Sequence, residues 1–149
     1  MKSLINGTIF LMTILGLFLV MSTLSMANFV SAQQTLDLKT PGGNEAFGGD
    51  NKGSILLVPK EHSVNIVATM DTPPKEGKAF EGWLADVGGS EYKLSLGEFS
   101  KNGTLDYTGT MVNPYTYTQF LVTEEPFEDP DPNGASVVAG AELVSPFGQ

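Results

Sequence analysis

Short runs of alternating apolar residues, separated by turn residues, constrain the fold more than any other feature of this chain. Every second residue is apolar, as at Val64 and Ile66, which is the pattern of a strand with one buried face. Prolines, paired glycines and Asn102-Gly103, a hairpin signal, stand between the runs and favour turns over helices. The runs span residues 54–58, 63–69, 78–87, 91–99, 105–112, 115–124 and 136–143. The sequence therefore predicts an all-β domain over residues 53–149, an antiparallel β-sandwich of about seven strands.

The first thirty-two residues have the layout of a secretory signal peptide. Lys2 is their only charge, Ile9 to Val20 is almost wholly apolar, and Val30-Ser31-Ala32 resembles a signal peptidase site. We expect residues 1–32 to direct export and to be cleaved after Ala32. The alternative is a retained membrane anchor, because residues 5–30 are uncharged and a spanning helix needs about 20 apolar residues. Both alternatives place the remaining chain outside the cytoplasm, secreted or held at the outer face of the cell membrane.

Composition excludes several classes of function. The chain has seventeen carboxylates against eight lysines, a net charge of -9 at pH 7, and no arginine. Nucleic-acid binding is excluded, because phosphate backbones need a basic protein surface. Cysteine is absent, which excludes disulfides and thiolate–metal sites. Residues 33–52 are polar and rich in glycine, and they predict a flexible linker between the leader and the β-domain.

Five short motifs between residues 64 and 143 follow one another in an order that a known family shares. They are Pro74 with Gly77, Phe80-Glu81-Gly82-Trp83-Leu84, Leu96-Gly97-Glu98-Phe99, Phe120 to Pro126, and Val138-Ala139-Gly140. In this order they resemble the extracytoplasmic C-terminal domain of the anti-sigma-K factor family. The resemblance implies a β-sandwich that faces away from the cytoplasm. Members of that family carry a cytoplasmic sigma-binding domain before their membrane span, and only four residues precede the apolar run here. We therefore do not expect sigma-factor binding.

The segment from Asp129 to Gly134 matches the first half of a calcium-binding loop. Asp129, Asp131 and Asn133 supply oxygens at positions 1, 3 and 5, and Gly134 supplies the turn at position 6. Position 12 is Gly140 rather than a bidentate glutamate, and two prolines stiffen a loop that must wrap around an ion. The sequence favours a rigid solvated turn here, with a calcium site at the three oxygen-bearing residues as the alternative.

Catalytic machinery is not evident in the sequence. His62 is the only histidine and is expected in a turn between two strands. No serine lies in a Gly-x-Ser-x-Gly motif, so no triad is indicated. We therefore expect no enzyme, and the acidic cluster from Glu124 to Asp131 is the one candidate for an acid-dependent hydrolase.

The aromatic residues are assigned to a core and to a loop. Tyr115 and Tyr117 follow Asn113-Pro114, where they either lead into a strand, the favoured interpretation, or contact carbohydrate or protein. Asn102 begins a glycosylation sequon on an expected hairpin. The residues expected to fill the core of the sandwich are Phe80, Trp83, Phe99, Tyr107 and Phe120.

Together these features predict an exported, non-catalytic β-sandwich that acts as a binding or interaction module for a protein or carbohydrate outside the cytoplasm. The alternative is a membrane-anchored sensor or accessory domain that regulates a separate membrane protein. No cofactor is expected apart from calcium at the acidic loop.

Overall fold

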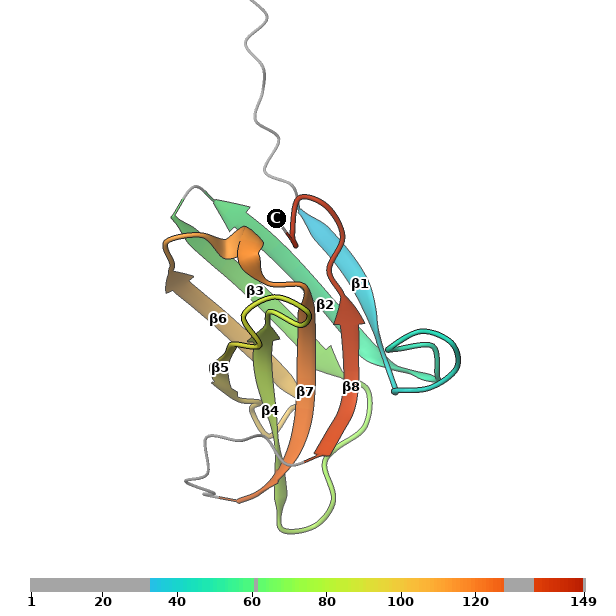
Figure 1. The fold of residues 1–149 in the computed structure, drawn as a ribbon. Coiled ribbons are helices and arrows are strands. Elements are labelled where there is room, and N and C mark those ends of the chain that lie inside the picture. The colour runs from blue at the N-terminus through green and yellow to red at the C-terminus, as the bar shows by residue number, and fades with distance from the viewer. Residues whose placement is uncertain (1–32, 61, 128–135, 149) are drawn as a thin grey trace, which may run out of the picture.

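The computed structural model describes residues 33–60, 62–127 and 136–148, and these residues form an all-β fold (Figure 1). The strands are antiparallel and belong to one sheet of eight, in the order β5-β4-β7-β8-β1-β2-β3-β6. Their bounds are β1 (Gln34–Lys39), β2 (Asn51–Lys60), β3 (Ser63–Met70), β4 (Lys78–Ala85), β5 (Lys93–Glu98), β6 (Thr104–Thr110), β7 (Gln119–Pro126) and β8 (Ser136–Glu142). A short 3-10 helix, η1 (Pro114–Thr116), precedes β7. The prediction of an all-β antiparallel domain is confirmed.

The sheet folds over on itself, so that the half formed by β5, β4, β7 and β8 faces the half formed by β1, β2, β3 and β6 (Figure 1). Its two outermost strands, β5 and β6, come close to each other, which nearly closes the sheet. The turn at Asn102-Gly103 therefore does not join a hairpin. Gly103 adopts a φ of 75°, as a tight turn requires, but the chain crosses there from one half of the sheet to the other.

The expected linker over residues 33–52 is wrong for its first and last residues, which form β1 and the start of β2. Leu38 is fully buried and Leu36 is half-buried, so β1 alternates like the other strands. The third inward position of β1 is Gln34, a polar residue that is 7% exposed. Apolar alternation does not reveal this strand, because one inward position is a glutamine and the residues that follow are rich in glycine.

One continuous hydrophobic core lies between the two halves of the sheet. Leu57 and Ile66 come from one half and Leu84 and Phe120 from the other, and all four are fully buried. Burial of each such side chain stabilises the fold by about 1.5–3 kcal/mol relative to exposure. Of the aromatic residues predicted for the core, Phe80, Phe99 and Phe120 belong to it and Tyr107 packs against it.

Trp83 lies on the opposite face of the sheet from this core, so the prediction for this residue is wrong. Alternation along β4 places Phe80 and Leu84 inward and leaves Trp83 pointing outward. There it forms a second cluster with Ala85, Leu121 and Phe47, in which Trp83 is 4% exposed. Its indole Nε1–H donates a hydrogen bond of 2.9 Å to the Thr123 hydroxyl, which satisfies the buried donor.

The expected leader, residues 1–32, lies outside the described residues. Among the residues that the structure describes, no helix has the length and hydropathy of a membrane span.

Candidate functional site

The candidate site is a gap between two neighbouring strands of the sheet. Among the described residues β1 and β8 share one paired position, Lys39 with Gly140. On its other side β1 pairs with β2 from Gln34 to Lys39, and β8 pairs with β7. In an antiparallel ladder alternate residues turn their backbone N–H and C=O groups away from that partner. Both strands therefore present backbone hydrogen-bonding groups to the gap where they diverge.

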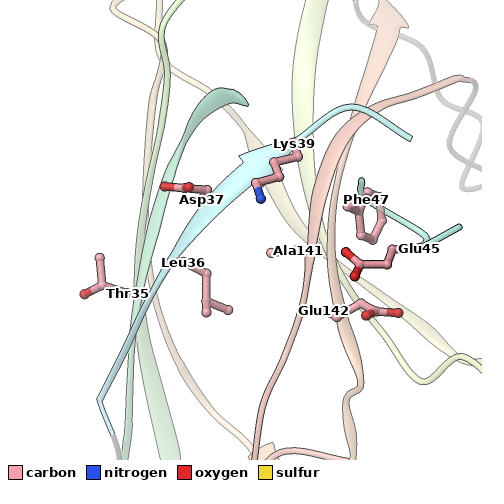
Figure 2. A pocket seen from close by; sticks show the side chains of 8 residues that line it. All are labelled: Thr35, Leu36, Asp37, Lys39, Glu45, Phe47, Ala141 and Glu142. Carbon is pink, nitrogen blue, oxygen red and sulfur yellow. The ribbon is translucent and has the colours of Figure 1, made fainter. Parts of the chain in front are cut away.

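This gap is a slit with a volume of about 330 Å³, at the lower end of the range for ligand pockets. Strand β1 forms one side, the end of β8 forms the other, and the loop between β1 and β2 closes one wall (Figure 2). Its lining residues are Thr35, Leu36, Asp37, Lys39, Glu45, Phe47, Ala141 and Glu142. We call this feature the β1–β8 slit.

Gln34 closes the far end of the β1–β8 slit. Its side-chain Nε2 donates to the backbone carbonyl of Val144 and, at 3.3 Å, to that of Ser145. In return its Oε1 accepts a hydrogen bond of 3.2 Å from the Val144 backbone N–H. The side-chain amide thus takes the place of a backbone ladder, and the slit is bounded by Gln34 at one end and by the Lys39–Gly140 pair at the other.

The loop wall is held in place by Phe47. Backbone hydrogen bonds from Thr40 N–H to the Asp50 carbonyl (2.9 Å) and from Gly49 N–H to the Thr40 carbonyl (3.0 Å) close the base of the loop. Phe47 then reaches back onto the sheet and packs over Gly140, where an added Cβ would lie 2.5 Å from its ring. Because Gly140 has no side chain, Phe47 can pack against β8, and Glu45 of the same loop lines the slit.

Three carboxylates and one ammonium group line the slit, which gives it a net negative charge. Asp37, Glu45 and Glu142 are exposed and Lys39 is half-buried. Glu45 and Glu142 lie together beside Phe47 in Figure 2. Among the described residues no group of three or more histidines or carboxylates is placed to hold a metal ion. The arrangement suits a cationic side chain next to an apolar one, presented on a backbone that can pair with a strand.

Comparisons of this chain with protein-family models, with curated proteins and with solved structures found no match. The resemblance to the anti-sigma-K factor family therefore stays a prediction.

The sequence did not predict the β1–β8 slit. Asp37, Lys39, Glu45 and Phe47 all fall in the segment expected to be a linker. The signals that could have revealed it are Leu36 and Leu38, which alternate, and Phe47, the one aromatic residue in that glycine-rich segment.

The predicted calcium residues Asp129, Asp131 and Asn133 lie outside the described residues. Glu124, at the start of the acidic cluster considered for hydrolysis, makes a structural contact with Lys75. Its carboxylate accepts hydrogen bonds from the Lys75 ammonium group (2.8 Å) and the Lys75 backbone N–H (3.0 Å). These bonds from Lys75 hold the pKa of Glu124 below its usual range. Glu124 therefore fastens the loop before β4 to the end of β7.

His62, Tyr115 and Tyr117 each make contacts within the fold. His62 lies in the turn between β2 and β3, as predicted, and its carbonyl accepts a hydrogen bond of 3.0 Å from the Met111 backbone N–H. Tyr115 packs edge-on against Phe147, with ring centroids 5.6 Å apart. Tyr117 is 8% exposed, and burial raises the pKa of its phenol. The favoured interpretation is confirmed, since both tyrosines lie in the segment that leads into β7 and pack against the core.

Proposed function

We propose that this protein is an exported, non-catalytic β-sandwich that acts as a binding module, and that the β1–β8 slit accepts an extended, basic peptide segment. The observation that carries the proposal is the interrupted pairing between two adjacent strands inside an acid-lined slit. The resemblance to the C-terminal domain of anti-sigma-K factors agrees with a binding role outside the cytoplasm.

An extended peptide suits the slit because its backbone can pair with the groups that β1 and β8 leave available. Strand addition of this kind gives affinity through main-chain hydrogen bonds, each with a net contribution of about 0.5–1.5 kcal/mol. Alternate side chains of the peptide would meet Leu36 and Ala141 on the core side of the sheet, and Phe47 with the carboxylates on the outer side. Phe47 already fixes the loop wall and Gln34 the far end of the slit, so little ordering is required on binding.

The binding experiment uses a blocked hexapeptide of alternating lysine and valine, followed by hydrogen exchange on the purified protein. We expect saturable binding and slower exchange of the β1 amides near Leu36 and the β8 amides near Ala141. Glu142→Lys should reduce affinity at least tenfold, whereas Asp106→Lys, an equal charge change on the distant strand β6, should change it less than threefold. Equal losses from both variants would show non-specific charge attraction and reject the site.

The leader decides between the proposed function and its alternative, a membrane-anchored accessory domain that regulates a separate membrane protein. Mass spectrometry of the exported protein distinguishes the two. A chain that begins at Gln33 supports a released module, and an intact leader recovered in the membrane fraction supports the anchored domain.

A further inference from the structure

A second surface differs in charge from the rest of this acidic protein. It is a groove of about 470 Å³ between the loop that joins β3 to β4 and the turn that joins β5 to β6. Three lysines line it together with two prolines and an exposed phenylalanine: Lys75, Lys78, Lys101, Pro73, Pro74 and Phe127. We call it the lysine groove.

The walls of the lysine groove are held by specific contacts. Phe80 and Phe99 meet edge to face beneath it, with ring centroids 6.2 Å apart, and the Phe99 backbone N–H donates to the Phe80 carbonyl at 2.8 Å. The loop wall is fastened by the pair of hydrogen bonds from Lys75 to Glu124. Phe127 is tied to the same loop by a hydrogen bond of 3.2 Å from its backbone N–H to the Gly77 carbonyl. These contacts fix the shape of the groove at this end of the sheet.

The charge of the groove opposes the charge of the molecule. The whole chain has a net charge of -9, yet three of its eight lysines face this one groove. Among the described lining residues Glu98 is the one carboxylate, and Glu124 stands behind Lys75. Lys75 is 80% exposed, so its ammonium group can reach a ligand while it still contacts Glu124. The lysines therefore favour a ligand that carries negative charge.

The groove also presents apolar surface to solvent. Phe127 is 62% exposed, although its backbone is fixed, and it stands beside Pro73 and Pro74. Together these three residues give the groove a small apolar surface next to its lysines. A ligand that carries an apolar side chain as well as carboxylates therefore fits this groove.

We propose that the lysine groove binds an acidic peptide segment of a partner protein that carries an apolar side chain between its carboxylates. A protein is favoured over anionic lipid by the direction in which the groove faces. Strand β1 begins at one end of the molecule, whereas the loop before β4 and the start of β4 lie at the other (Figure 1). If the leader holds the protein at a membrane, as the anchored alternative requires, the groove points away from that membrane.

Fluorescence anisotropy with two blocked pentapeptides tests the proposal on the purified protein. The first has a phenylalanine flanked on each side by two glutamates, and the second has glutamines in place of the glutamates. We expect the acidic peptide to bind at least tenfold more tightly than its amide counterpart and to weaken as salt rises. Equal affinity for the two peptides, or no saturation by either, would overturn the proposal.

Single variants locate the site. Lys78→Gln, Lys101→Gln and Phe127→Ala should each lower affinity for the acidic peptide at least fivefold. Lys93→Gln, the same change at an exposed lysine of β5 that does not line the groove, should leave it within twofold. Thermal melting of each variant checks that the fold is kept. If Lys93→Gln has the same effect as the groove variants, binding depends on overall charge and the site is rejected.

Two further measurements distinguish peptide binding in the lysine groove from lipid binding and from binding in the β1–β8 slit. Vesicles of phosphatidylcholine with a third of phosphatidylglycerol should not sediment the protein, and lysine-dependent sedimentation without peptide binding would replace the peptide by a lipid surface. Glu142→Lys, which disables the β1–β8 slit, should leave binding of the acidic peptide unchanged. The two sites can therefore fail independently.

Discussion

The seam between β2 and β3 and the seam between β1 and β8 join neighbouring antiparallel strands of the same sheet, yet they are built differently. From the Gly53–Met70 pair to the Lys60–Ser63 pair every residue of the first seam has a partner. The second seam has one pair at Lys39 and Gly140, and beyond it a slit closed by the side chain of Gln34. A continuous ladder uses its backbone groups within the sheet, whereas the interrupted one leaves some with which the proposed peptide would pair.

Removing a core side chain beneath the continuous seam should have the largest effect on stability. Leu57 of β2 is fully buried in the core, so Leu57→Ala should lower the free energy of unfolding by about 2–5 kcal/mol. Leu36→Ala, at the half-buried wall of the slit, should cost about 1 kcal/mol because less surface is lost there. Urea denaturation measures both. Equal losses would show that the two seams contribute alike.

Removing Phe47 should loosen the wall of the β1–β8 slit and uncover Trp83. We expect Phe47→Ala to destabilise the fold by about 2–3 kcal/mol, less than a central core phenylalanine, because its cluster is small. Trp83 is the only tryptophan, so fluorescence reports this cluster alone, and its emission should shift to the red. Val112→Ala, at a side chain that is 95% exposed, is the control and should change neither quantity. An unshifted emission would show that Phe47 does not cover the indole.

Removing the amide of Gln34 should open the far end of the slit. Gln34→Ala loses hydrogen bonds to Val144 in a partly buried setting and should cost about 1–2 kcal/mol. Hydrogen exchange at the Val144 amide should accelerate, while exchange at Leu57, in the continuous seam, should change only with global stability. Gln34→Glu places a carboxylate oxygen against the carbonyls of Val144 and Ser145 in a buried position, so at pH 7 it should destabilise the fold more than Gln34→Ala. Unchanged exchange at Val144 would contradict the role assigned to Gln34.

Removing the charge of Glu124 should have the smallest effect, and it separates the lysine groove from both seams. The folded-state pKa of Glu124 is lowered by hydrogen bonds from Lys75, so its contribution is present above the unfolded pKa of about 4.3. That contribution is lost as the pH falls through the folded-state value. Glu124→Gln should therefore lower stability at pH 7 by less than about 1 kcal/mol, since Lys75 is 80% exposed. The difference from the unchanged protein should vanish at acidic pH, and a constant difference across the range would contradict the assignment.

Apolar alternation predicted β2 to β8 and most of the core, because these strands bury one face with side chains that are themselves apolar. It missed β1, where Gln34 occupies an inward position and is satisfied by hydrogen bonds to a segment that follows β8. It also misplaced Trp83, although the period of β4 puts this residue outward, because nothing local shows that Phe47 will cover it.

The candidate site was less predictable than the fold for the same reason. The β1–β8 slit depends on contacts between residues about as far apart in the chain as Gln34 and Val144. Asp37 and Glu45 look like solvated linker residues until β1 is known to be a strand. The lysines of the groove are likewise scattered along the sequence, and only the return of β4 beside the β5–β6 turn brings them together.

Gln34 has a mechanical consequence as well. It ties the first strand to the segment after the last one, so both ends of the described domain leave from the same corner of the sheet. Tension applied through these ends would break the Gln34 contact first and then the Lys39–Gly140 pair, one after the other. Because these contacts break one at a time, separating β1 from β8 needs less force than shearing β2 past β3, whose pairs resist together.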